Sequence, residues 1–279
     1  MTHEGTPTMH DTPPATTLPD DGSGLHIEVC GDGPPLVLLH GWAMHGGVFA
    51  PLVARLRAHR TVYCVDLPGH GRSREATVPL ALVPVVEALA SRLPSAPWLG
   101  WSLGGLFALQ AAASRPGTVT ALAMLCANPR FVRGEDWTHG MAPEIFHDFA
   151  RGLRDDYRGT LDRFIALEAF GSDDARGELR ALRAEVFARG EPAAHALVDG
   201  LHLLRTVDLR AALPGLTVPS LWLAGRRDRL VDPQAMHAAA AQAPGAQAHT
   251  IAHAGHAPFL THADTVAEHL LAFLSTAAA

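Results

Sequence analysis

The chain has 279 residues, of which 48% are hydrophobic and 18% charged, and its formal net charge is −6. This composition supports one large hydrophobic core and excludes a chain that is disordered throughout. The negative balance argues against a nucleic-acid-binding protein, which needs a basic surface, so no nucleic acid is expected among the partners.

The N-terminal segment, residues 1–24, is rich in Thr, Pro, Asp and Gly and lacks the basic start and apolar centre of a signal peptide. We therefore expect a disordered tail. No apolar run approaches the roughly 20 residues that a membrane-spanning helix needs, so no membrane association is expected. Cys30, Cys64 and Cys126 are widely spaced and form no CxxC pair. They indicate buried thiols in a reducing, cytoplasmic compartment and no metal site.

Short apolar runs alternate with helical patterns along the rest of the chain. Continuous apolar runs predict strands at residues 36–40, 61–66, 98–100, 119–126, 220–225 and 248–251. The segments between them predict helices at residues 48–57, 80–93, 103–115, 233–243 and 265–275. This alternation predicts an α/β fold in which helices flank a mostly parallel sheet.

One long stretch breaks this alternation. Residues 129–209 contain no convincing strand, and Ile145, Phe149 and Leu153 recur every four residues, as on one face of a helix. We therefore divide the chain into a core of residues 25–128 and 210–279 and a helical cap of residues 129–209. In α/β enzymes such an insertion lies over the carboxyl ends of the strands, where ligands bind.

The most informative short motif is G-x-S-x-G at residues 100–104. The bare pattern also occurs in ordinary glycine-rich turns, but here a predicted strand precedes it and a predicted helix follows. Ser102 would then sit on a sharp strand-to-helix turn, where Gly100 and Gly104 relieve crowding. The N-terminus of the helix would direct free N–H groups at a developing oxyanion. Ser102 is therefore predicted to be the catalytic nucleophile.

A catalytic serine needs a base and an orienting acid, which on this kind of fold follow in the order Ser, acid, His. The next-to-last predicted strand is followed by Asp228 and Asp232. Asp228 is favoured as the acid, because Asp232 precedes Pro233 as a helix N-cap would. The last strand is followed by His253 and His256. The small neighbours of His256 leave room for its ring to reach a serine, which favours it as the base.

The oxyanion hole needs two backbone donors near the serine. Leu103 follows Ser102 directly, and Trp42 lies in the loop after the predicted strand at residues 36–40. Their N–H groups are predicted to form the hole. The alternative is that the loop at Trp42 is an ordinary strand-ending turn.

Taken together, these motifs resemble the α/β-hydrolase superfamily over about residues 25–276. The matching segments are HGW at 40–42, DLPGHGRS at 66–73, GWSLGG at 100–105 and GHAPF at 255–259. Finer patterns are similar to one family within it, the pimeloyl-[acyl-carrier protein] methyl ester esterases of biotin synthesis. These are WLGWSLGG at 98–105, RFIAL at 163–167 and RTVDLR at 205–210. The resemblance implies a serine esterase that needs no cofactor or metal and has an acyl-carrier protein as partner. We expect it to act as a monomer.

The resemblance also implies roles for residues of the cap. The expected pocket residues are Trp42, Phe164, Ile165, Ala166, Leu167 and Glu168, and the expected contacts to the acidic carrier protein are Arg163, Arg176 and Arg180. The alternative for the arginines is ordinary surface ion pairing, because residues 151–189 hold eight arginines and eight acidic residues. Two positions depart from the family pattern, with Glu168 in place of Gln and Gly159 in place of Arg. They bear on substrate contacts rather than on the chemistry.

Two other functions are compatible with the motifs. A broad-specificity short-chain carboxylesterase would use the same three residues on small esters. A non-catalytic binding protein on the same fold is disfavoured because Ser102, Asp228 and His256 are all present.

Overall fold

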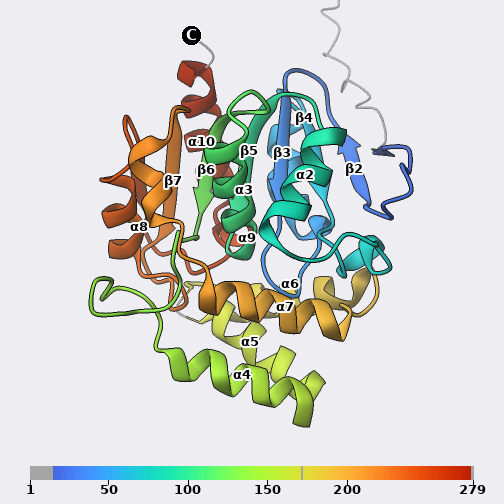
Figure 1. The fold of residues 1–279 in the computed structure, drawn as a ribbon, viewed down its shortest axis with the longest axis vertical. Coiled ribbons are helices and arrows are strands. Elements are labelled where there is room, and N and C mark those ends of the chain that lie inside the picture. The colour runs from blue at the N-terminus through green and yellow to red at the C-terminus, as the bar shows by residue number, and fades with distance from the viewer. Residues whose placement is uncertain (1–14, 171, 278–279) are drawn as a thin grey trace, which may run out of the picture.

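A single mixed sheet forms the centre of the computed structural model, which describes residues 15–170 and 172–277. Its order is β1-β2-β4-β3-β5-β6-β7-β8 (Figure 1). The strands are β1 (Thr16–Thr17), β2 (Ile27–Cys30), β3 (Pro35–Leu39), β4 (Thr61–Val65), β5 (Ala96–Trp101), β6 (Val119–Leu125), β7 (Ser220–Gly225) and β8 (Gln247–Ile251). The strands from β3 to β8 pair in parallel, whereas β1 and β2 run antiparallel to their neighbours. The predicted α/β fold is confirmed.

All six predicted strands are present, and burial explains why they could be recognised. Residues 36–39 of β3 and all residues of β7 are buried, because the central strands are covered on both faces. A parallel strand in that position needs apolar side chains on both faces and therefore has a continuous apolar sequence. The edge strand β8 is partly exposed at four of its five positions, and its sequence is correspondingly polar.

The sequence predicted neither β1 nor β2, and the tail prediction for residues 1–24 is wrong in its described part. Residues 1–14 lie outside the described residues. Residues 15–24 are held against the core, because Thr16 pairs with Val29 of β2 and because Arg92 donates a hydrogen bond to the Pro19 carbonyl at 2.7 Å. Both partners are distant in sequence, so local composition could not indicate them.

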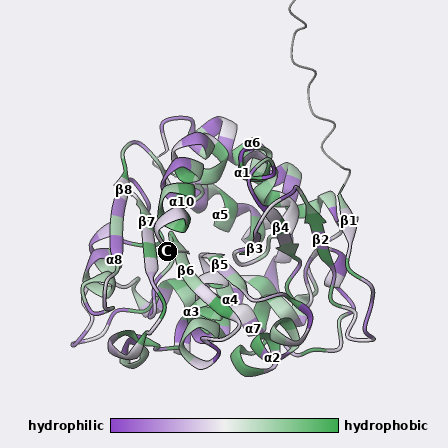
Figure 2. Ribbon diagram, turned by 90° about the horizontal axis from the view of Figure 1, so that it is seen from above, coloured by the Kyte–Doolittle hydropathy of each residue, from purple (hydrophilic) through white to green (hydrophobic). Residues whose placement is uncertain are grey.

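Helices cover both faces of the sheet. They are α1 (Ala50–Leu56), α2 (Leu82–Arg92), α3 (Leu103–Ser114), α8 (Pro233–Ala240), α9 (Pro258–Thr261) and α10 (Ala263–Ala277), with short 3₁₀ turns η1 (Gly46–Phe49), η2 (Gly71–Ser73) and η3 (Arg210–Gly215). Figure 2 shows α1 and α10 on one side of the sheet and α2 and α3 on the other. Helix α3 packs directly on β5 and β6, which fixes the start of α3 beside the end of β5.

In the described part of the chain, four further helices lie between β6 and β7: α4 (Pro143–Asp155), α5 (Tyr157–Ala169), α6 (Ala175–Ala188) and α7 (Ala194–Thr206). They gather at the end of the sheet where the parallel strands finish (Figure 1). The Leu209 N–H donates to the Pro129 carbonyl at 2.9 Å, so this segment leaves and rejoins the core at adjacent points. We refer to it as the cap.

Buried polar contacts fasten the cap to the core. Arg189, just after α6, forms ion pairs with Glu28 of β2 at 2.8 Å and with the buried Asp66 after β4 at 3.3 Å. The indole N–H of Trp42 donates to the Leu197 carbonyl of α7 at 2.9 Å. The cap therefore rests on the loops that follow β3 and β4.

Neither membrane spans nor disulfides occur in the described part of the chain. Among residues 15–170 and 172–277, no helix is both long and apolar enough to cross a membrane. All three cysteines are free thiols, and Cys64 and Cys126 are buried while Cys30 is partly exposed.

Candidate active site

Ser102 occupies a strained turn between β5 and α3. Its φ is 53° and its ψ is −120°, a backbone conformation that residues other than glycine rarely adopt. The neighbouring glycines permit this turn. A Cβ at Gly100 would lie 2.4 Å from the Gly104 carbonyl oxygen, and a Cβ at Gly104 would lie 2.2 Å from the Leu39 carbonyl oxygen. The turn places the Ser102 side chain at the end of the central strand, above the N-terminus of a twelve-residue helix.

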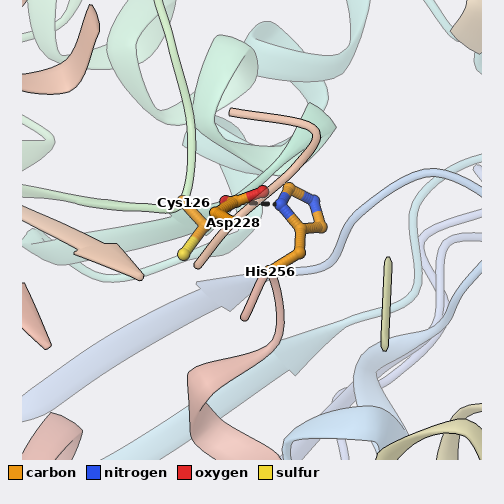
Figure 3. Close-up of side chains that lie close together, drawn as sticks. All are labelled: Cys126, Asp228 and His256. Carbon is orange, nitrogen blue, oxygen red and sulfur yellow. Dashed lines mark hydrogen bonds and ion pairs between the residues drawn. The ribbon is translucent and has the colours of Figure 1, made fainter. Parts of the chain in front are cut away.

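Asp228 and His256 form a buried hydrogen-bonded pair at the ends of β7 and β8. Nδ1 of His256 lies 2.8 Å from Oδ2 of Asp228 (Figure 3), and both side chains are fully buried. The other oxygen of Asp228 accepts the N–H groups of Leu230 at 2.8 Å and Val231 at 2.9 Å, which fixes the carboxylate. In the neutral tautomer that donates its Nδ1 proton to Asp228, Nε2 is the acceptor, and the described chain offers it no hydrogen-bond partner.

The structure brings together the preferred acid and base and gives the two alternatives other roles. Asp232 caps α8, accepting the Gln234 N–H at 2.8 Å. His253 is 61% exposed and forms an ion pair with Asp173 at 3.1 Å. Trp101 connects the turn of Ser102 to the loop of His256. It directly precedes Ser102, and its indole N–H donates to the His256 carbonyl at 2.8 Å.

Cys126, at the end of β6, lies beside this pair (Figure 3). Potential metal-ligand atoms of Cys126, Asp228 and His256 lie within 4.8 Å of one another. Burial raises the pKa of the Cys126 thiol well above its usual value, with the Asp228 charge adding to the effect. The cluster is therefore a hydrogen-bonded Asp–His pair beside a neutral thiol, which is a poor set of metal ligands.

Two backbone donors are available next to Ser102. Within the described chain, neither the Trp42 N–H nor the Leu103 N–H donates to a protein acceptor. The loop of Trp42 approaches closely, since a Cβ at Gly41 would lie 3.1 Å from the Ser102 Cβ. Both predicted donors therefore have free N–H groups in segments that adjoin the serine.

His40 holds the loop of Trp42 in place. One ring nitrogen lies 2.7 Å from the Gly41 carbonyl, and the other accepts the Leu67 N–H at 2.9 Å. Burial keeps the pKa of His40 well below its usual value, so the ring is neutral, with a proton on Nδ1 and an acceptor at Nε2. This role follows from tertiary contacts, and the sequence motif alone did not reveal it.

An apolar pocket lies between Ser102 and the cap. Its lining residues are Ser102, Phe131, Met141, Ile145, Phe146, Phe149, Phe164, Leu201, Leu204 and Leu230. Ser102 is the only polar member of this set. A pocket of this composition suits a hydrocarbon chain whose reactive end meets the serine.

The comparisons with known proteins agree with this geometry. The family described as alpha/beta hydrolase fold matches residues 34–263. The chain belongs to the α/β-hydrolase fold family. The resemblance predicted from the motifs is confirmed.

Two relatives of this α/β hydrolase carry the same name. A pimeloyl-[acyl-carrier protein] methyl ester esterase of Xanthomonas campestris pv. campestris (strain B100) is 62% identical over 251 residues, covering 90% of this chain and 99% of that protein. The protein of that name from Stenotrophomonas maltophilia (strain K279a) is 61% identical over 256 residues, covering 91% of this chain and 98% of that protein.

Solved structures of other α/β hydrolases share the fold at low sequence identity. An enol-lactonase from Burkholderia xenovorans LB400 has a TM-score of 0.81 and 22% identity, covering 93% of this chain and 100% of its own. The esterase EaEST from Exiguobacterium antarcticum has a TM-score of 0.78 and 22% identity, covering 90% and 95%. These likenesses concern the fold alone.

The expected pocket residues of the cap separate into two groups. Phe164 lines the pocket and stacks edge-on against Trp42, with ring centroids 4.5 Å apart. Ala166 is exposed, and neither Ile165 nor Leu167 lines the pocket. The expectation that residues 164–168 all face the substrate needs correction, because successive residues of one helix turn point in different directions.

The three expected carrier contacts are all exposed arginines. Arg163 donates to the Thr160 hydroxyl at 2.6 Å and lies 3.8 Å from Asp156. Arg176 and Arg180 are one turn apart on α6, and within the described chain neither has an ion-pair partner. These two therefore share one helix face with their charges unpaired.

Glu168 is a buried carboxyl group on α5 of the cap, with no hydrogen-bond partner in the described chain. Burial raises its pKa well above the usual value, and Glu178 and Asp228 add to the effect. The unfolded chain releases this proton near pH 4.5, so Glu168 lowers the stability of the fold progressively as pH rises above that value.

Glu168→Gln is therefore expected to raise the free energy of unfolding at pH 8 and to change it little at pH 4. Urea denaturation at both pH values checks this. Glu144→Gln, an exposed change on α4, is the control and should be neutral at both. Equal destabilisation by Glu168→Gln at pH 4 and pH 8 would contradict the argument.

Proposed function

We propose that this protein is a serine carboxylesterase that hydrolyses the methyl ester of pimeloyl-[acyl-carrier protein] in biotin biosynthesis, releasing methanol and pimeloyl-[acyl-carrier protein]. The observation that carries the proposal is the 62% identity, over 90% of this chain, to a protein named for that activity. The arrangement of Ser102, Asp228 and His256 supports it, because that arrangement suits acyl transfer through a serine.

The proposed mechanism gives each of these groups one role. His256 Nε2 takes the proton of Ser102 as the serine oxygen attacks the ester carbonyl. Asp228 keeps the imidazole in the required tautomer and stabilises the imidazolium. The N–H groups of Trp42 and Leu103 stabilise the tetrahedral oxyanion. His256 then protonates the leaving methoxide, and water, activated by the same imidazole, hydrolyses the acyl-enzyme.

The pocket supports a substrate with a hydrocarbon chain. Nine of its ten lining residues are apolar, and the tenth is Ser102. It shares Met141, Ile145 and Leu230 with a neighbouring polar groove that also includes Arg226 and Arg229. An apolar slot that adjoins a polar groove suits an acyl chain joined to a polar group.

The decisive experiment compares three esters: the methyl ester of pimeloyl-[acyl-carrier protein], free pimelate monomethyl ester and p-nitrophenyl acetate. We expect kcat/KM to be highest for the carrier-bound ester and to fall as salt increases, because charge attraction to an acidic carrier is screened. Equal or better turnover of the two small esters would instead indicate a broad-specificity short-chain carboxylesterase.

We further propose that Arg163, Arg176 and Arg180 contact the carrier protein. The double variant with Arg176→Ala and Arg180→Ala is expected to lower kcat/KM for the carrier-bound ester by about tenfold. Charges at the edge of an interface mainly affect the rate at which the partners associate. Turnover of p-nitrophenyl acetate should not change.

Arg183→Ala is the matched control for this pair. Arg183 lies on the same helix but is already held by two hydrogen bonds to Asp162, at 2.9 and 2.7 Å. If Arg183→Ala lowers kcat/KM as much as the double variant does, the effect is not specific to the predicted contacts.

A further inference from the structure

A second buried carboxyl group of the cap makes no hydrogen bond of normal geometry within the described chain. Glu178, in the first turn of α6, is 1% exposed, and both of its oxygens lack a hydrogen bond of normal geometry. Buried polar groups are hydrogen-bonded in the great majority of cases, so this exception needs a reason. The ester hydrolysis described above makes no use of it.

The segment that leads into α6 lies directly over the loop that carries His256. The Asp173 N–H donates to the His253 carbonyl at 3.3 Å, and the two side chains form an ion pair. A Cβ at Gly255 would lie 3.3 Å from the Ser172 Cβ, so the two backbones pass close to each other. The cap is therefore anchored at the loop of His256, and Glu178 follows this anchor by one helical turn.

The charges around Glu178 belong to the catalytic pair. Burial raises the pKa of Glu178 to about 7, and the negative Asp228 acts in the same direction. The Ser172 hydroxyl, the Ala257 N–H and the charge of His256 lower the pKa of Glu178. The carboxyl group of Glu178 and the imidazole of His256 thus interact electrostatically.

The other titratable groups packed here come from three elements. Glu168 lies at the end of α5, Asp228 follows β7, and Cys126 follows β6. Burial favours the neutral forms of Glu168 and Cys126 by raising the pKa of each well above its usual value. That leaves Asp228 and Glu178 as the two carboxyl groups of this cluster whose negative charge acts on His256 when they are ionised.

We propose that Glu178 is a positioning residue for the reaction: its carboxylate, held by the cap over the loop of His256, stabilises the protonated imidazole and so makes His256 a stronger base. The inference rests on the proposed function, in which His256 accepts the serine proton. A nearby negative charge favours an imidazolium, and the charge of Glu178 is supplied by the cap rather than by the core.

The test is the pH dependence of ester hydrolysis by the full chain, followed between pH 5 and 9 by methanol release from pimelate monomethyl ester. Glu178→Gln removes the charge and keeps the shape. We expect the acid limb of kcat/KM to move to lower pH by about 0.5 to 1 unit. The weaker base should also lower kcat by about three- to tenfold while leaving KM unchanged.

Two further variants keep the test interpretable. Glu178→Asp restores the charge and should return the acid limb most of the way to that of the wild type. Glu178→Met fills the same space with a side chain that carries no charge. It should shift the acid limb as Glu178→Gln does, and it serves as the test variant if Glu178→Gln does not fold. Glu185→Gln, a half-buried carboxylate two turns along the same helix, is the matched control and should leave the limb unmoved.

An acid limb of Glu178→Gln that coincides with that of the wild type overturns the inference, whatever happens to the melting temperature. A purely structural role would change stability or overall rate and leave the limb in place. Ser102→Ala is measured in the same series. Hydrolysis that survives Ser102→Ala defeats the proposed function, whereas Ser102-dependent hydrolysis with an unmoved limb defeats this inference alone.

Discussion

Ser102→Ala is expected to lower kcat for ester hydrolysis by about 10⁴- to 10⁶-fold, as removal of a triad nucleophile does elsewhere. The reason is that the variant retains the apolar pocket and the free N–H groups of Trp42 and Leu103 but has no oxygen to form the acyl-enzyme. The fold should be unaffected, because the Ser102 side chain makes no capping hydrogen bond to α3. Steady-state hydrolysis of p-nitrophenyl acetate and thermal unfolding together check both expectations.

Ser114→Ala is the matched control for this change. Ser114 is exposed at the opposite end of α3, where its hydroxyl donates only to the Gln110 carbonyl. It should hydrolyse the ester at the wild-type rate. If Ser102→Ala retains activity within tenfold of that rate, the hydrolysis proceeds without the proposed nucleophile and the mechanism is wrong.

The residues of the candidate site could be selected from sequence because each one follows a recognisable strand. Ser102, Asp228 and His256 come after β5, β7 and β8, and the carboxyl ends of parallel strands meet at one edge of the sheet. The local sequence also distinguished Asp228 from Asp232, since a carboxylate before Pro233 is typical of a helix start. The structure contains the corresponding capping hydrogen bond, from the Gln234 N–H to Asp232.

Contacts between distant segments could not be predicted in this way. The strand β1 is a two-residue pairing with β2, and Arg92 of α2 donates a hydrogen bond to the Pro19 carbonyl, which follows β1. The bond from the Trp101 indole to the His256 carbonyl spans 155 positions of the chain. None of these partners has a local pattern that names it.

In the cap, the resemblance to the esterase family implied more pocket residues than one face of a helix can present. Residues 164–168 were expected to face the substrate together, yet one turn of α5 directs Phe164 into the pocket and leaves Ala166 exposed. Glu178 shows the converse. In the sequence it is one acidic residue in a segment balanced between arginines and acids, and only its burial in the folded cap distinguishes it.

The second large effect is expected for Asp228→Asn, which should lower kcat by about 10⁴-fold near neutral pH. One oxygen of Asp228 accepts two backbone N–H groups, from Leu230 and Val231, and the other faces Nδ1 of His256. In asparagine the oxygen must keep the two backbone donors, so the NH₂ group turns toward His256. The imidazole then carries its proton on Nε2 and cannot accept the proton of Ser102.

Asp232→Asn separates this effect from a general loss of charge in the loop. Asparagine caps helices as well as aspartate does, so this variant should keep α8 and hydrolyse the ester within about twofold of the wild-type rate. Steady-state kinetics on both variants, with thermal unfolding to show that each is folded, decides the matter. A comparable loss in both would mean that the loop as a whole, rather than the hydrogen bond to His256, supports the reaction. An Asp228→Asn variant that retains a tenth of wild-type activity would show that His256 adopts the reactive tautomer without the Asp228 carboxylate.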